Sequence, residues 1–141
     1  MARRIMLNGT SYFGQGAIQE IVNEIKNRHF KKALVTSTPD LFEFKVATKV
    51  TDLLDAAGID YEIYDGIKPN PTIENVTAGV DACKAAGADV IVAVGGGSPI
   101  DTSKAIATII TNHAILSHSA VYSHSISKIS SYFHQVHFVH T

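Results

Sequence analysis

The sequence predicts an α/β domain built on a parallel sheet with flanking helices. Three observations predict it: apolar stripes at helical spacing alternate with short β-branched runs, the run at 90–94 is apolar throughout, and a glycine-rich turn follows that run directly. Strands that alternate with amphipathic helices indicate βαβ units, and a wholly apolar strand is typical of a strand covered by helices on both faces. The pattern therefore favours a parallel sheet over a meander.

Composition limits the classes of protein that fit. The chain has 141 residues, 45% hydrophobic and 18% charged, which suits one globular core. Its formal charge of -1 leaves no field to hold a nucleic acid or an anionic membrane, and a single cysteine excludes an intrachain disulfide. No run of eighteen apolar residues and no signal h-region is present. We therefore expect a soluble, cytoplasmic protein without nucleic acid or membrane partners.

The first half of the domain contains two expected helices and one strand. Residues 17–28 carry an apolar stripe opposite a polar one, which predicts an amphipathic helix. The apolar run at 33–36 predicts a buried strand that ends in a turn at 38–40. Apolar residues at helical spacing from 46 to 57 predict a second helix, which Gly58 ends because glycine suits the left-handed position after a helix.

The second half repeats this alternation. A strand is expected at 61–64, followed by a loop whose two prolines hold the chain extended and fix Asn70 before Pro71. Thr72 is expected to begin a third helix, with Ile73 on its apolar stripe, and Gly87 to end it. The buried strand at 90–94 then leads into the glycine-rich turn and a final apolar helix.

The turn GGGSPID, residues 95–101, occupies the place where open parallel sheets bind ligands. Successive glycines let the backbone approach a ligand closely, while Ser98 at the N-cap and Pro99 in the first turn leave free N–H groups for an anion. Asp101 at N3 has two interpretations: a capping box with Ser98, or an acceptor for ribose or nicotinamide. The alternative for the whole turn is a tight connection without a ligand, and for Asn70 a simple turn residue.

The turn matches neither a Walker A motif nor the GxGxxG pattern. With the preceding GADVIVAV and the loop YDGIKPNPT, however, it closely resembles the nucleotide-binding part of the iron-containing alcohol dehydrogenases. The resemblance covers about residues 3–112. It implies a Rossmann-like dinucleotide-binding domain at 1–112, with the helical metal-binding domain missing from this chain.

The resemblance also implies roles for individual residues. The backbone at Gly96, Gly97 and Ser98 would hold the pyrophosphate of the dinucleotide. Asp101 would lie near the ribose and nicotinamide side, and Asn70 would face the dinucleotide from the neighbouring loop. The first strand, Arg4 to Asn8, would pair across a homodimer interface.

One position departs from the family pattern. Family members that prefer NAD usually carry an aspartate after the first strand of the nucleotide fold, where its charge repels the 2′-phosphate of NADP. Thr38 occupies that position here, and Asp40 is the nearest carboxylate. The cofactor expected from the resemblance is therefore NAD(H) or NADP(H).

Composition changes abruptly at residue 112. All thirteen acidic residues precede it, whereas 113–141 holds six of the seven histidines, seven serines and one lysine. We expect 113–141 to be an aberrant, poorly ordered tail, as a frameshift with an early stop would produce. Its histidines lack a carboxylate to orient them, so no metal site is expected there.

Two hypotheses follow. In the first, the chain is a truncated NAD(P)-binding part of an iron-dependent alcohol dehydrogenase, without catalytic or metal-binding residues of its own and inactive alone. By the resemblance, one aspartate and three histidines of the absent domain hold the iron in the intact enzyme. In the second, the chain is a noncatalytic binding or interaction module that keeps the glycine turn only as structure.

Overall fold

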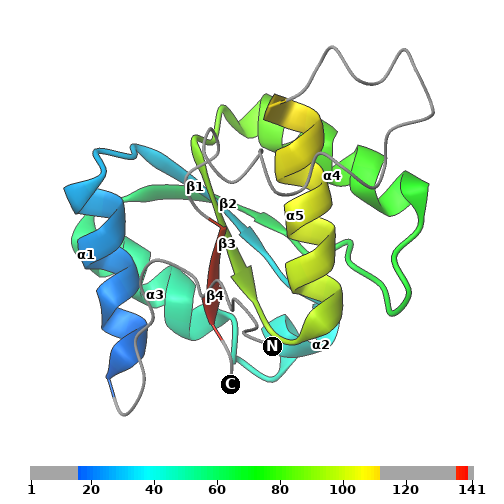
Figure 1. Ribbon diagram of the computed structural model, residues 1–141. Helices are drawn as coiled ribbons and strands as arrows, with labels where there is room; N and C mark the ends of the chain where they lie inside the picture. Colours follow the sequence, from blue (N-terminus) through cyan, green and yellow to red (C-terminus); the bar gives the residue numbers. More distant parts are fainter. Residues whose placement is uncertain (1–15, 112–135, 140–141) are drawn as a thin grey trace, which may run out of the picture.

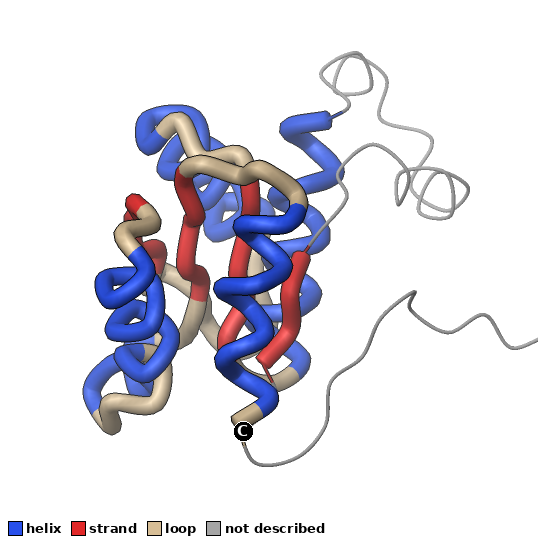
Figure 2. The backbone as a smooth tube through the Cα atoms, turned by 90° about the vertical axis from the view of Figure 1, so that its left-hand side faces the viewer, coloured by secondary structure: helices blue, strands red, loops and turns tan. Residues whose placement is uncertain are grey.

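The computed structural model describes residues 16–111 and 136–139. Within these ranges the chain forms a four-stranded parallel sheet with strand order β2-β1-β3-β4, and helices lie on both sides of the strands (Figures 1 and 2). The predicted parallel α/β architecture is confirmed. The strand expected from Arg4 to Asn8 and, except for His137, the histidines of the tail lie outside the described residues.

One face of the sheet is covered by α1 (Glu20–Asn27), which follows the short turn η1 (Ala17–Gln19), and by α3 (Thr48–Ala57). The apolar stripes predicted for these helices point inward, since Ile25, Val50 and Leu54 are fully buried. They pack against alternate residues of β1 (Lys32–Thr36) and β3 (Val90–Val94). Burial of one such side chain contributes about 1.5–3 kcal/mol, which makes this cluster a main source of stability.

The opposite face is covered by α4 (Ile73–Ala86) and α5 (Gly97–Thr111). Its core combines these helices with the remaining strand residues: Leu34, Val80, Cys83, Ile91, Ile106 and Ala107. β3 is therefore buried on both sides, as its uninterrupted apolar sequence predicts. β2 (Asp60–Tyr64) forms one edge of the sheet.

Helix ends follow the predicted local signals. Gly58 and Gly87 adopt left-handed φ values of 69° and 65° after α3 and α4, which residues with a Cβ rarely adopt. Thr72 caps α4, and its partner in the capping box is Asn75. The ends of both helices are thus confirmed.

Three local expectations are wrong. Pro39 and Asp40, expected in the turn at 38–40, instead begin the short helix α2 (Pro39–Glu43), because Pro39 fits the first position of a helix. Ile73 is 80% exposed at the first turn of α4, where the helix has not yet reached the sheet. Asn70 has φ 55° instead of an extended conformation, which asparagine tolerates better than most residues.

The segment 113–141 contributes one strand, β4 (Val136–Val139). β4 pairs in parallel with β3, with Ile91 opposite Val136 and Val94 opposite Val139. The expectation of a poorly ordered tail therefore does not extend to these four residues. The physical reason is the outer edge of β3, whose buried N–H and C=O groups need partners.

Candidate functional site

The register of the sheet brings the ends of three strands to one edge. Thr36, the last residue of β1, pairs with Tyr64 of β2 and with Ala93 of β3. The residues that follow these strands therefore begin at the same level: Thr38 soon after β1, the loop of Asn70 after β2, and the glycine turn after β3. The strands that precede Thr38, the loop of Asn70 and the glycine turn therefore all end at this edge.

The same edge contains the point at which the chain changes direction across the sheet. From β1 the chain crosses to β2 through α3 on one face, and from β3 it continues into α5 on the other face. The connections that leave β1 and β3 therefore diverge to opposite faces. Ligands of open α/β sheets bind in the crevice that such a divergence creates.

Gly95, the first glycine of the turn, is required by the fold. Its φ is 129°, and an added Cβ would lie 2.7 Å from Cδ1 of Leu41 in α2 and 3.1 Å from Cγ of Pro99. A side chain here would strain the backbone and collide with α2. The interpretation of the turn as a tight connection therefore holds for Gly95.

Gly96 and Gly97 have no such requirement. Neither has a positive φ, both are exposed, and an added Cβ would meet no atom within 4 Å. Glycine at the start of a helix is destabilising relative to alanine. The folded chain alone thus gives no reason for glycine at these two positions.

α5 begins at Gly97, one residue before the Ser98 N-cap that the sequence predicts. The first helical hydrogen bond runs from the amide of Ile100 to the carbonyl oxygen of Gly96, at 3.3 Å. The N–H groups of Gly97 and Ser98 precede this bond and lie at the positive end of the helix dipole. Asp101 is exposed and lies beyond the N3 position, so the predicted capping box with Ser98 does not form.

Thr38 and Asp40 lie beside this turn because α2 follows β1 directly. Thr38 is half-buried and adopts an extended conformation (φ -80°, ψ 154°) as the N-cap of α2, without a side-chain capping bond. Asp40 is exposed in the first turn of α2. Leu41 packs on Gly95, which fixes α2 against the glycine turn.

The loop of Asn70 is anchored on both sides. Ile67 is fully buried, and the amide nitrogen of the Asn75 side chain donates to the carbonyl oxygen of Gly66 at 3.1 Å. The Tyr64 hydroxyl donates to the Asn75 carbonyl oxygen at 2.6 Å, and burial, with a smaller effect from Asp65, raises the pKa of Tyr64. These contacts anchor the chain before and after the exposed Asn70.

Sequence reasoning missed a set of buried hydroxyls beneath the site. Thr36 Oγ1 and Ser103 Oγ share a hydrogen bond of 2.6 Å, and Ser37 Oγ donates to the Val94 carbonyl oxygen at 2.8 Å. Thr102 Oγ1 is also buried and has no partner within the described ranges. No signal in the sequence points to them, because Thr36 ends an ordinary strand run and Ser103 lies in the polar stretch at 101–104.

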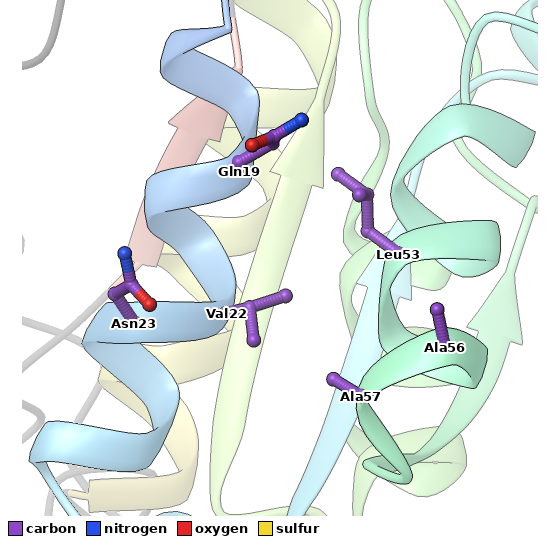
Figure 3. A pocket seen from close by; sticks show the side chains of 6 residues that line it. All are labelled: Gln19, Val22, Asn23, Leu53, Ala56 and Ala57. Atoms are coloured by element: carbon purple, nitrogen blue, oxygen red, sulfur yellow. The ribbon is translucent and has the colours of Figure 1, made fainter.

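A separate groove of about 290 Å³ lies between α1 and α3 (Figure 3). Its lining is Gln19, Val22, Asn23, Leu53, Ala56 and Ala57. None of these is a predicted site residue or carries an ionisable group. In the part of the chain that the structure describes, no three His, Cys, Asp or Glu side chains gather to hold a metal, and no helix is long and apolar enough to cross a bilayer.

Comparison with known proteins identifies relatives for most of the chain. A family model described as iron-containing alcohol dehydrogenase matches residues 8–133, so this match continues past the compositional boundary at 112. Lactaldehyde reductase of Escherichia coli is 47% identical over 112 residues, which are 79% of this chain and 29% of that protein.

Solved structures agree with this relationship. A 1,3-propanediol oxidoreductase superimposes with TM-score 0.68 and 36% identity over 71% of this chain and 26% of its own. The NADH-dependent butanol dehydrogenase A of Thermotoga maritima does so with TM-score 0.67 and 31% identity over 89% of this chain and 30% of its own. The chain thus spans less than a third of the length of these relatives.

Proposed function

The chain belongs to the iron-containing alcohol dehydrogenase family, and from this premise we propose that residues 1–112 form a nicotinamide-dinucleotide-binding domain. The complete enzyme that we infer resembles lactaldehyde reductase and transfers a hydride reversibly between the nicotinamide and a short-chain aldehyde or alcohol. The chain covers 29% of the length of that reductase, so this activity is proposed for the whole enzyme and not for the chain alone.

The proposal rests on one observation: the fold does not require glycine at position 96 or at position 97. A Cβ at either position would enter open space, yet both stand where a helix begins at the crevice of an open sheet. A ligand that packs directly on the backbone accounts for both. The exposed N–H groups and the helix dipole favour an anionic ligand, which fits a pyrophosphate.

The roles proposed for the other site residues rest on the resemblance to the family and on the sheet edge at which the three strands end. In this proposal the amides of Gly96, Gly97 and Ser98 bind the pyrophosphate, Asp101 lies toward the ribose and nicotinamide, and Asn70 faces the dinucleotide. The bound nicotinamide supplies the hydride acceptor or donor of the reaction. The protein residues contribute binding and orientation, because hydride transfer needs the nicotinamide held against the carbonyl carbon.

The described residues offer no set of ligands for the iron. We therefore expect the purified chain to oxidise no alcohol even with added ferrous ion. Robust iron-dependent turnover by the chain alone would contradict this assignment. Gly95 favours the alternative of a purely structural turn, but the alternative leaves Gly96 and Gly97 unexplained.

Titration calorimetry with NADH tests the proposal, with Gly97→Ala as the decisive variant. Because its Cβ meets no protein atom, Gly97→Ala should raise the free energy of unfolding by about 0.5–1 kcal/mol. The same methyl group would obstruct a pyrophosphate, so NADH affinity should fall about tenfold or more. A purely structural turn predicts the same gain in stability and no NADH binding by either protein.

Gly95→Ala is the matched control. Its Cβ would collide with Leu41 and its φ is 129°, so this variant should lose stability by about 1 kcal/mol or more. Opposite effects of the same substitution at neighbouring glycines would separate the glycine that serves the fold from the one that serves the ligand.

A further inference from the structure

Two buried hydrogen bonds join the elements that form the proposed site. Thr36 at the end of β1 shares a 2.6 Å hydrogen bond with Ser103 of α5, and neither residue has exposed surface. Ser37 donates to the carbonyl oxygen of Val94, the last residue of β3, at 2.8 Å. The two bonds connect residues 67 and 57 positions apart in the sequence.

The position of the Thr36 and Ser103 bond makes it informative. Ser103 lies six residues after Gly97 on α5, and Thr36 lies two residues before Thr38. The bond therefore links the first two turns of the helix to the strand end that leads into α2. A bond at this place restrains the position of α5 relative to the end of β1.

Packing alone does not require hydroxyls at these positions. A buried hydroxyl is unfavourable unless it is bonded, and valine and alanine would occupy similar volumes without that requirement. Neighbouring positions on the same face of the sheet, such as Leu34 and Ile91, are apolar. The paired hydroxyls supply a directional restraint that apolar packing does not.

We propose that Thr36 and Ser103 are positioning residues for the dinucleotide site. Their hydrogen bond holds the N–H groups at the start of α5 in the orientation that a pyrophosphate needs, so the site is formed before the ligand arrives. This inference rests on the proposed function, since it assigns these residues to the same site. Neither side chain contacts the ligand in this assignment.

The test compares Thr36→Val, Ser103→Ala and the double variant in the full chain. Each single variant leaves one buried hydroxyl without its partner, so each should lower the melting temperature by a few degrees. The double variant leaves neither hydroxyl and should recover most of that loss. Its NADH affinity, measured by calorimetry, should nevertheless remain about five- to tenfold below that of the parent.

The double variant distinguishes a positioning role from a purely structural role, because a positioning role predicts that the melting temperature recovers while the NADH affinity does not. If the bond served stability alone, affinity would recover together with the melting temperature in the double variant. Ser103→Thr, which keeps a hydroxyl, should retain more affinity than Ser103→Ala. Thr51→Val is the matched control, because it removes a buried hydroxyl of α3 that donates to the Thr48 carbonyl oxygen, and it should leave NADH affinity unchanged.

Hydrogen exchange gives a readout that needs no ligand. In the double variant the amide of Ile100, which donates to the carbonyl oxygen of Gly96 at the start of α5, should exchange several-fold faster than in the parent, while amides of β1 and β3 keep their protection. If the parent binds NADH and the double variant binds equally well with unchanged exchange, the positioning role is overturned. If the parent binds no NADH, the proposed function fails and the positioning role fails with it.

Discussion

At the scale of single residues, the three glycines of the turn divide into two kinds. Gly95 combines a positive φ with close contact to Leu41, so the fold itself requires glycine there. Gly96 and Gly97 lie in ordinary backbone conformations with free space around them. The sequence shows that the run of glycines is unusual, but only the structure shows which of the three the fold requires.

Thr38 offers a test of cofactor selectivity at the same scale. Thr38→Asp would place a carboxylate beside the crevice, where it should repel the 2′-phosphate of NADPH while accepting hydrogen bonds from a free ribose hydroxyl. We expect the ratio of NADH to NADPH affinity to rise about tenfold, which corresponds to about 1.4 kcal/mol. Aspartate is also a favourable N-cap, so α2 should be preserved.

Thr38→Asn is the matched control, since it has the shape and capping ability of aspartate without its charge. Calorimetric titration of both variants with NADH and NADPH measures the two ratios. An unchanged ratio in Thr38→Asp would show that this residue lies away from the 2′ position. In that case Asp40 becomes the residue to examine.

At the scale of helices and strands, predictions succeeded where a single residue or one uninterrupted run decides the outcome. Gly58 and Gly87 end their helices because a left-handed residue is needed there, and the apolar run 90–94 forms the strand covered on both faces. Prediction failed where two signals compete. Ser98 and Pro99 are both good residues for a helix start, and α5 begins one position before the first of them.

Short elements and distant contacts were also beyond prediction. α2 has five residues, fewer than two helical turns, so no periodicity can show in its sequence. Thr36 reads as an ordinary strand residue, and its pairing with Ser103 depends on the packing of α5. The edge that holds the site was predictable because parallel strands end together, whereas the hydroxyls beneath it were not.

The end of α1 permits a prediction about stability. His29 follows this helix with φ 61°, a conformation that costs a residue with a Cβ about 1 kcal/mol. His29→Gly should therefore raise the free energy of unfolding by about 0.5–1 kcal/mol after the greater freedom of glycine in the unfolded chain is included. Urea denaturation followed by circular dichroism measures the change.

Lys26→Gly provides the comparison within the same helix. Lys26 is exposed and lies inside α1, where glycine should cost about 0.5–1 kcal/mol. Opposite signs at two sites three residues apart would assign the effect to backbone conformation. A loss of stability in both variants would mean that the His29 side chain contributes more than its backbone conformation costs.

At the scale of the whole molecule, one sheet separates two apolar cores, and β3 contributes to both. The proposed site lies at the carboxyl edge, where α5 and the connections from β1 and β2 meet. The relatives are more than three times as long as the matched part of this chain, so only dinucleotide binding, and not the hydride transfer of the whole enzyme, is proposed for this chain. A folded, ligand-binding chain without turnover is the expected behaviour.

Alkylation of the buried Cys83 thiol gives a way to measure the stability of the folded chain. Cys83 is 2% exposed in the core between α4, α5 and the sheet, and burial raises the pKa of its thiol. The folded chain therefore holds a neutral, inaccessible thiol, and alkylation by iodoacetamide at pH 8 should require unfolding. The rate in increasing urea should follow the fraction unfolded, and fast labelling without urea would contradict the packing of α4.

The same thiol predicts the direction of a pH effect. Because the pKa of Cys83 is higher in the folded than in the unfolded chain, its contribution to stability is complete below the unfolded value of about 8.5 and is lost as pH rises toward the folded value. The free energy of unfolding should therefore fall between pH 8 and pH 9.5, a range that lies below the ordinary tyrosine pKa of about 10. Cys83→Ala leaves a cavity and lowers stability at every pH, but it removes this slope, so an equal slope in both proteins would assign the alkaline loss to other groups.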